Sequence, residues 1–585
     1  MLDFRSKQYR EQTSQKISWG HWFAFFNIIW SVLIGSRYAF IIDWPDTLWG
    51  KLYFFISLFG HFSFICFAVY LLVIFPLSFL IKNERTFRGI SVIIATLATT
   101  LLFLDTEVFA RFNLHLSSLV WNLLVNPENG ELSRHWQIFF SPMPFLLLLQ
   151  MLFSRWAWYR LRSLERQKWI RYVGFTLTAF FVATHLIYAW ADAYVYRPIT
   201  MQKSNFPLAY PMTARTFLEK NGLLDKTVYS GKLAEEGRPE ALKMHYPKRS
   251  LQFGEITEKP NLLFLNISGL RADAINQEDM PNLVAFAEKS TQFMNHYSSG
   301  NNHNTGLVGM FYGINAGYLD SILQNKTESV LLEKLKQEGY QFHFLSSAPF
   351  KEVFSQQLLF KGKRGISQLF DNKSAVENLL DLLGQPQESP FFSYVNLDVI
   401  GPMDVAKSAD LTQEKQAYKV QLQKLDEQLV PILAKFPREN LFVVITADQG
   451  YTFQQKEKDE HNFSVEQIQV PFILSWKNSA AAKYEGLSSH SDLVPTLLNG
   501  LFNVQNPMTD YAEGQNLLQF KERNWVLLAN YRWNVIITPE GTQHHIDKKG
   551  NYQKFDRTYQ KQPSTRPPLG LFLEVFNQQG AFFDK

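Results

Sequence analysis

The run LYFFISLFGHFSFICFAVYLLVIFPLSFLI at residues 52–81 contains no Asp, Glu, Lys or Arg. A helix needs roughly 20 apolar residues to cross the hydrocarbon core of a bilayer, and a helix satisfies all its own backbone hydrogen bonds there. Four more apolar runs lie near this one, so the sequence predicts five membrane-spanning helices at about residues 17–42, 52–81, 89–104, 136–158 and 172–191. We therefore expect a five-helix transmembrane domain over residues 1–192.

Loop charges predict the orientation of these helices. Lys and Arg gather before the first predicted span, in the loop after the second (82–88) and in the loop after the fourth (155–171), whereas the alternate loops carry Asp and Glu. Basic loops stay in the cytoplasm, so the N-terminus is predicted to be cytoplasmic in a bacterial inner membrane. An odd number of spans then places everything after residue 192 in the periplasm. The net charge of +5 follows largely from these loops, so we expect no nucleic-acid partner.

Residues 193–250 are predicted to form an interfacial connector, because prolines alternate there with charged and aromatic residues. We expect a helix to begin after Pro211 with Thr213 as its N-cap. The backbone N–H groups at such a start favour an anion, and Arg215 adds a guanidinium suited to phosphate. The alternative is a linker that lies on lipid headgroups without specificity.

From residue 251 to 585, apolar strand-like runs alternate with helical ones. The clearest strands are residues 261–267, 340–345, 391–397, 441–446 and 470–476. This alternation predicts a mostly parallel sheet covered by helices on both faces, with ligands bound beyond the carboxyl ends of the strands. Residues 524–585 are predicted to form shorter, irregular strands. The single cysteine, Cys66, allows no intrachain disulfide, so this domain must depend on a large core.

Four motifs in this region resemble the sulfatase/alkaline-phosphatase superfamily. They are NLLFLNISGLRAD (261–273), VVITADQG (443–450), VPFILSW (470–476) and SSHSDLVPTLL (488–498). The resemblance implies a doubly wound α/β domain. It also implies a site in which one or two divalent metals, such as Mg or Mn, assist a hydroxyl nucleophile.

The motif positions of that superfamily are altered in this chain. Ser268 occupies the place of the carboxylate after the first strand, and a neutral hydroxyl is a poor replacement for an anionic ligand. The nucleophile belongs in the loop 298–305, where Asn302 or His303 aligns with the threonine of relatives. Thr305 and Ser299 remain as displaced candidates. We interpret His303 as an ordinary loop residue.

The later metal-binding positions are altered as well. The expected Asp-His pair is Asp448-Gln449, and Gln467 stands where a further histidine is expected; the nearest imidazole is His461. His490 and Asp492 fit the last motif, where a structural role suffices. We therefore predict no catalytic residue and no cofactor. Thr305 and Asp448 are vestigial catalytic candidates, and Ser268, Asp448, Gln449 and Gln467 are degenerate metal positions. The alternative is a metal-dependent phosphatase or headgroup transferase that uses Mg or Mn.

Motifs across the whole chain are similar to a family of Gram-negative inner-membrane proteins that sense lipopolysaccharide. They include WGHWFAFFN (19–27), PITM (198–201), YPMTAR (210–215), SSGN (298–301) and FYG (311–313). The resemblance implies lipid A binding in the periplasmic leaflet. It also implies a cytoplasmic-side adaptor and a membrane protease, through which the protein controls turnover of the enzyme that commits precursors to lipopolysaccharide synthesis.

Carried over by position, the implied lipid A contacts form one continuous stretch, which consists of Pro211, Met212, Thr213, Ala214, Arg215, Thr216 and Phe217. Relatives can carry two adjacent arginines, and here the second position is Thr216. One charge-assisted hydrogen bond is lost by this change, and Lys220 could replace it. A second alternative function is binding of cardiolipin or its transport to the outer membrane.

Overall fold

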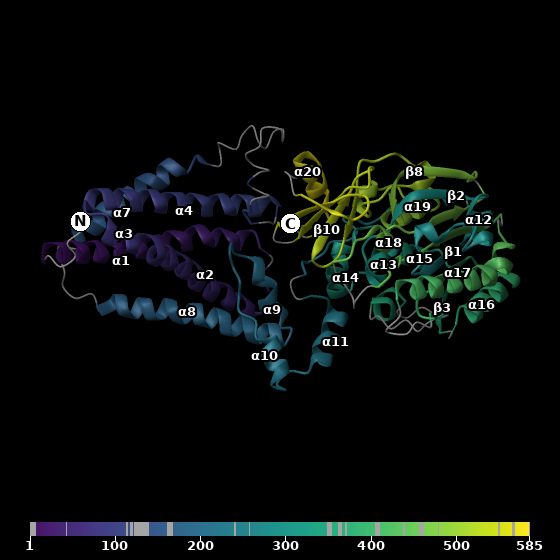
Figure 1. Ribbon diagram of the computed structural model, residues 1–585, viewed down its shortest axis with the longest axis horizontal. Helices are drawn as coiled ribbons and strands as arrows, with labels where there is room; N and C mark the ends of the chain where they lie inside the picture. Colours follow the sequence, from purple (N-terminus) through teal and green to yellow (C-terminus); the bar gives the residue numbers. More distant parts are fainter. Residues whose placement is uncertain are drawn as a thin grey trace.

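The computed structural model describes most of the chain. The described residues are 7–42, 44–112, 115–117, 121, 140–160, 168–238, 241–256, 258–347, 354–360, 366–368, 371–403, 410–436, 439–454, 461–477, 479–547, 550–563 and 568–583. They form an elongated molecule in which a helical bundle lies at one end and an α/β domain at the other (Figure 1).

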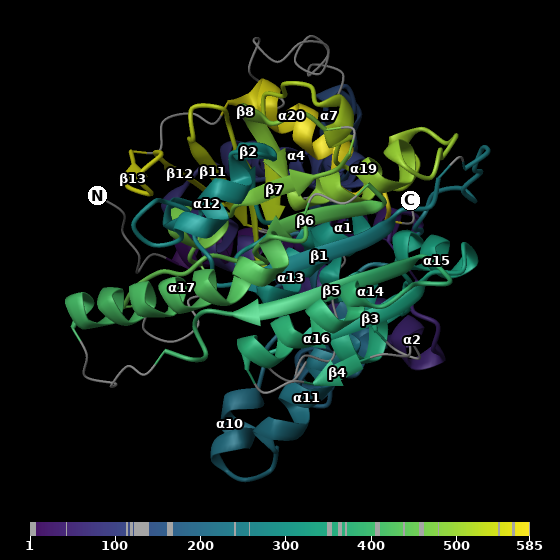
Figure 2. The same cartoon turned by 90° about the vertical axis from the view of Figure 1, so that its right-hand side faces the viewer.

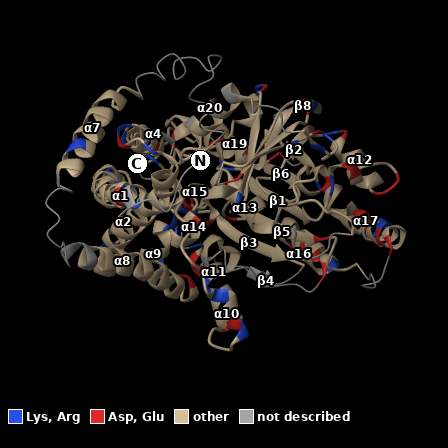
Figure 3. Ribbon diagram, turned by 60° about the vertical axis from the view of Figure 1, so that its left-hand side comes forward, with Lys and Arg blue, Asp and Glu red and all other residues tan. Residues whose placement is uncertain are grey.

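The bundle consists of long apolar helices. Among the described residues, four helices are long and apolar enough to cross a membrane, namely Tyr9–Phe40, Leu48–Leu80, Glu84–Ala110 and Tyr172–Ala193. Few charged residues lie along them, whereas charges are frequent on the α/β domain (Figure 3). The helices of the bundle are α1 (Lys7–Gly35), α2 (Leu48–Val69), α3 (Phe75–Leu80), α4 (Glu84–Phe112), α7 (Met143–Arg160) and α8 (Lys168–Ala193).

Helix α7 corresponds to the predicted fourth span, of which residues 136–139 lie outside the described part of the chain. It packs on α1 through aromatic rings. Phe26 stacks on Phe153 with ring centroids 4.3 Å apart, and Trp22 meets the edge of Trp156 at 5.6 Å. These contacts show that α7 belongs to the bundle. Each such aromatic pair contributes about 0.5–1.5 kcal/mol beyond its buried area.

The connector leaves α8 through a short helix α9 (Arg197–Thr200) and continues into α10 (Arg215–Lys220) and α11 (Lys226–Glu236). These two helices project at the junction between the bundle and the α/β domain (Figure 1). The prediction of Thr213 as N-cap is wrong, because the cap of α10 is Ala214 and no side chain caps it. The chain before the helix is held by the backbone N–H of Met212, which donates to His185 Nδ1 of α8, and α10 begins one residue later than a Thr213 cap requires.

The α/β domain is built on an eight-stranded sheet with the order β4-β3-β5-β1-β6-β7-β2-β8. All neighbouring strands run parallel except β7, which is antiparallel to both β6 and β2. This confirms the predicted α/β class. The strands are β1 (Asn261–Ser268), β2 (Thr291–Tyr297), β3 (Gln341–Ser346), β4 (Ile366–Gln368), β5 (Phe391–Asp398), β6 (Leu441–Thr446), β7 (Phe472–Ser475) and β8 (Ala482–Ser489).

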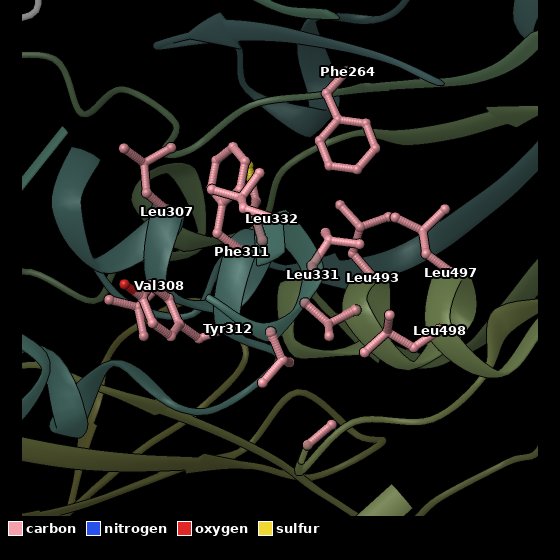
Figure 4. Close-up of a cluster of buried hydrophobic side chains, with 14 of the residues drawn as sticks. Phe264, Leu307, Val308, Phe311, Tyr312, Leu331, Leu332, Leu493, Leu497 and Leu498 are labelled. Carbon is pink, nitrogen blue, oxygen red and sulfur yellow. The ribbon is translucent and has the colours of Figure 1, made fainter. Parts of the chain in front are cut away.

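Helices cover both faces of this sheet because its central strands are apolar on both sides (Figure 2). Successive side chains of a strand point to opposite faces. Phe264 of β1 therefore joins one core, and its neighbours Leu263 and Leu265 join the other. The first core contains α13 (His303–Tyr312), α14 (Leu319–Asn325), α15 (Val330–Gln337) and α19 (Leu493–Gly500), and Figure 4 shows part of it. The second contains α12 (Pro281–Ala287), α16 (Asn372–Gly384) and α17 (Leu411–Leu433).

The last part of the chain forms a separate antiparallel sheet with the order β13-β12-β11-β10-β9. Its strands are short, as the sequence predicts for residues 524–585: β9 (Val526–Ala529), β10 (Trp533–Ile537), β11 (Gln543–Asp547), β12 (Tyr552–Phe555) and β13 (Lys561–Gln562). Helix α20 (Leu569–Gln578) covers it through Phe572 and Val575, which pack with Ile536 and Ile546.

Candidate functional site

The carboxyl ends of the central strands meet at one point, where ligands bind in sheets of this kind. β1 ends at Ser268 and β5 at Asp398, and these two residues are paired in the sheet register. β6 ends two residues before Asp448, and the N-terminal residue of α13, His303, reaches the same point. The fold thus brings together four polar side chains that lie far apart in the sequence.

Asp448 is the centre of this cluster, and its carboxylate is fully buried. Oδ1 accepts a hydrogen bond from Asn266 Nδ2 at 3.0 Å, and Oδ2 accepts from Ser268 Oγ at 3.2 Å and from His303 Nδ1 at 2.7 Å. Burial alone would raise the pKa of Asp448, but the His303 imidazole and these hydrogen bonds outweigh it, so the pKa lies below its usual value. The anion is therefore stabilised by protein donors on both oxygens.

The residues around Asp448 do not fit a divalent metal. Gln449 and Gln467, at two of the degenerate positions, bond to each other, since Gln467 Nε2 donates to Gln449 Oε1 at 3.1 Å. The second strand-end carboxylate, Asp398, accepts the backbone N–H groups of the following turn. Within the described ranges no three His, Cys, Asp or Glu side chains are grouped as a metal site. Divalent cations need several converging anionic or imidazole ligands, and the two carboxylates of this cleft, Asp448 and Asp398, already accept hydrogen bonds from protein donors.

Thr305 and Ser299, the two hydroxyl candidates for a nucleophile, are both buried. Thr305 is 2% exposed, and its hydroxyl donates to the carbonyl of Asn302 at 2.7 Å and accepts from the Asn302 N–H at 3.0 Å. With Asn302 as N-cap this forms a capping box at the start of α13. Ser299 is fully buried, and its Oγ has no hydrogen-bond partner among the described residues.

His490 lies in a buried chain of hydrogen bonds behind the cleft. Its Nε2 donates to the carbonyl of Ala447 at 2.9 Å, so its Nδ1 can accept from Nε2 of His296, also 2.9 Å away. His296 Nδ1 in turn accepts from Ser488 Oγ at 2.9 Å. Burial lowers the pKa of both imidazoles, that of His490 to about 4. Both rings are therefore neutral at pH 7, and both nitrogens of His490 are already bonded.

Asp492 forms a buried ion pair with Arg523. Its two oxygens meet Arg523 Nη1 at 3.0 Å and Nη2 at 2.5 Å, and they also accept the backbone N–H groups of Ser489 and Gln515. This arrangement ties β8 and the start of α19 to the segment that precedes β9. Asp492 of the last superfamily motif therefore bonds protein groups through both of its oxygens.

The connector presents the second candidate site. Met212 is tied to the membrane bundle because its N–H donates to His185 Nδ1 of α8 at 3.0 Å. Arg215 is held by Tyr229 of α11, which accepts a hydrogen bond from Arg215 Nη1 at 2.5 Å and places its ring 4.7 Å from the guanidinium carbon. Met212 and Phe217 are 46% and 66% exposed. A fixed cation therefore lies among exposed apolar side chains beside the end of the last spanning helix.

The remaining predicted contact residues lie on the same stretch. Thr213 and Thr216 are exposed, and Pro211 and Ala214 are half-buried. Lys220, at the last position of α10, is also exposed. Tyr229, which positions Arg215, was missed by sequence reasoning because it lies on a different helix, and an isolated tyrosine gives no signal of such a contact.

Sequence reasoning also missed partners in the cleft. His303 was interpreted as an ordinary loop residue, but it begins α13 and bonds Asp448 directly. Asn266 and Arg523 were not singled out, although each bonds a buried carboxylate. The polar Asn266 inside an otherwise apolar strand was the one signal that could have found it, since a buried amide requires a partner.

Two family models match successive parts of the chain. Residues 265–503 match the sulfatase family, and residues 6–253 match a domain of unknown function, DUF3413. A solved structure from Vibrio parahaemolyticus, of a protein in the alkaline phosphatase superfamily, is similar to this chain with a TM-score of 0.43 and 16% identity. The match covers 62% of this chain and 98% of that structure.

Two relatives match over their full length. An uncharacterized protein of Haemophilus influenzae is 57% identical over 100% of this chain and 99% of its own length. The inner membrane protein YejM of Salmonella typhimurium is 39% identical over 98% of this chain and 99% of its own length. Because this identity extends through the membrane bundle, the connector and the sulfatase-like domain alike, the chain belongs to the YejM family of inner membrane proteins.

Proposed function

We propose that this protein is a non-catalytic sensor of lipid A, the phosphorylated glycolipid anchor of lipopolysaccharide, in the periplasmic leaflet of the bacterial inner membrane. The observation that carries the proposal is the position of Arg215. The guanidinium is held by Tyr229 and lies among exposed apolar side chains. Arg215 is three residues after Met212, which is bonded to α8.

The chemistry of this site suits a phosphorylated lipid. A guanidinium pairs with phosphate through two parallel N–H donors, and the contact with Tyr229 reduces the rotamer entropy that Arg215 loses on binding. Met212 and Phe217 are exposed and can enter the interfacial layer of the bilayer. The Thr216 hydroxyl and the Lys220 ammonium supply further donors on the same short helix.

The sulfatase-like cleft supports a non-catalytic role. Metal-assisted transfer needs free anionic ligands and a hydroxyl that can attack, but Asp448 is saturated by protein donors and Thr305 caps its own helix. We infer that the α/β domain lies in the periplasm, in agreement with the loop charges.

Regulation would follow from differential binding. A ligand shifts a conformational equilibrium only by the difference between its affinities for the two states. Lipid A on the connector would bias the bundle, through the His185–Met212 contact, toward one way of engaging a cytoplasmic-side adaptor. The adaptor would in turn set how fast a membrane protease degrades the enzyme that commits precursors to lipopolysaccharide synthesis.

The test replaces the chromosomal gene with an Arg215→Ala variant and measures lipopolysaccharide and the abundance of that enzyme. The matched control is Lys232→Ala, which removes one exposed cation from the neighbouring helix α11. We expect both quantities to change in Arg215→Ala and to stay at wild-type levels in the control, with equal amounts of inserted protein in each strain. Unchanged lipopolysaccharide in Arg215→Ala would contradict the proposal.

A further inference from the structure

An apolar cavity of about 260 Å³ lies within the membrane bundle, on the side where α2 and α4 flank α1. Its inner wall is formed by α1, where Ser31 is 6% exposed, and its rim includes Leu101 of α4, which is 42% exposed. The cavity therefore opens sideways. Because these helices cross the membrane, the medium at that opening is the hydrocarbon of the bilayer.

Polar residues in the wall are satisfied within the protein. Asn27 donates through Nδ2 to the carbonyl of Phe23 at 2.9 Å and accepts from Gln150 at 2.7 Å. Ser31 accepts from the Cys66 thiol at 3.1 Å, and Thr99 donates to a carbonyl of its own helix at 2.8 Å. Asp105, at one end of the lining, accepts from the Leu116 N–H at 2.5 Å and from the Tyr38 hydroxyl. A hydrocarbon guest would therefore leave none of these hydrogen bonds unmade.

The length of the cavity matches one leaflet. Along α4 its lining runs from Asp105 to Ala95, which at 1.5 Å per residue is about 15 Å, or half of a hydrocarbon core of about 30 Å. Pro207 and Leu208 of the connector close the end near Asp105. The deeper end lies at a π-helical turn that begins at Tyr70 and ends at Ile74, and such turns are frequent at functional sites.

We propose that this cavity binds one acyl chain of a membrane lipid from the leaflet on the connector side. The lining is mostly apolar, and apolar cavities of about 150 Å³ stay dry and accept hydrocarbon guests. The bound acyl chain would contact Pro207 and Leu208. These residues belong to the same connector as Arg215, so filling the cavity would affect the position of the connector. This site is separate from the exposed connector surface, and the proposal does not rest on recognition of lipid A.

The test uses the full-length protein in nanodiscs of phosphatidylethanolamine and phosphatidylglycerol, with a trace of phosphatidylethanolamine that carries a diazirine in the middle of one acyl chain. After irradiation, adducts are mapped by mass spectrometry. We expect adducts on the inner-wall residues Asn27 and Ser31, as well as on outward-facing Leu72. Ala98→Trp, at the mouth of the cavity, should lower the inner-wall adducts several-fold and leave those on Leu72 unchanged.

The matched control is Leu97→Trp, which adds the same ring to the adjacent, lipid-facing position and should leave the inner-wall adducts at the wild-type level. Ser31→Leu fills the cavity from the other side and serves if Ala98→Trp does not fold. Inner-wall residues without adducts in the wild type, or undiminished adducts in a folded cavity-filling variant, would overturn the proposal. Neither result would affect lipid A binding by Arg215, which is measured separately.

Discussion

Replacing Asp448 by alanine should destabilise the α/β domain. Three donors, from Asn266, Ser268 and His303, would lose their acceptor. His303 is 24% exposed and can turn to water, but Asn266 is fully buried and would be left with an unsatisfied N–H. A buried donor left without an acceptor costs about 1–3 kcal/mol, so we expect the free energy of unfolding to fall by about 1–3 kcal/mol.

Thermal unfolding of the full-length protein in detergent, followed by near-ultraviolet circular dichroism, measures this loss. Limited proteolysis across the same temperatures assigns the transition to the α/β domain. At roughly 2 °C per kcal/mol for a domain of this size, Tm should fall by about 2–6 °C. Asp448→Asn keeps an acceptor oxygen at the same place and should lower Tm by much less.

The sign of this change discriminates between the two interpretations of the cleft. Side chains kept for catalysis are commonly held at a cost in stability, so their removal often stabilises the protein. A rise in Tm for Asp448→Ala would therefore refute the argument that this carboxylate is retained for structure. It would restore the hydrolase alternative.

Three further predictions concern the same domain. The stability that Asp448 contributes is present above an unfolded-state pKa of about 4, and it is lost as the pH falls through the lower folded-state pKa, so Tm should fall more steeply below pH 5 in the wild type than in Asp448→Asn. Arg523→Met leaves Asp492 buried and unpaired and should cost about 3–5 kcal/mol, read from Tm, and an unchanged Tm would contradict the ion-pair geometry. Gly306→Ala would place a Cβ 2.2 Å from the Asp448 carbonyl oxygen and should cost about 1–3 kcal/mol, whereas Gly570→Ala, which meets nothing within 4 Å, should not destabilise.

The sequence was sufficient to predict the strands whose two faces are both buried. β1 and β6 are runs of apolar residues, and burial on both faces of a parallel sheet requires such runs. Strand β2 was missed because it is only partly buried. Strand β8 was missed because it is an edge strand whose first residues are exposed. Half-buried polar strands are defined by their neighbours in the sheet, which local sequence does not reveal.

The cleft was predicted only in part, because its contacts join distant segments. The pair His303–Asp448 spans 145 residues, and no local pattern indicates that the start of α13 reaches the end of β6. The error at Thr213 has a similar cause, since the preceding residue, Met212, bonds to His185, which lies 27 residues earlier on α8. Residue types at motif positions were read correctly from the sequence, but their hydrogen-bond partners required the fold.

The most direct test of the account is the binding of purified lipid A to the full-length protein in nanodiscs, measured in the presence of EDTA. We predict saturable binding without divalent metal. We also predict a loss of about tenfold to a hundredfold in affinity for Arg215→Ala, as expected for one charged hydrogen-bonding contact. Lys232→Ala should bind like the wild type. Equal affinity of Arg215→Ala and the wild type, or binding that requires the metal, would contradict the account.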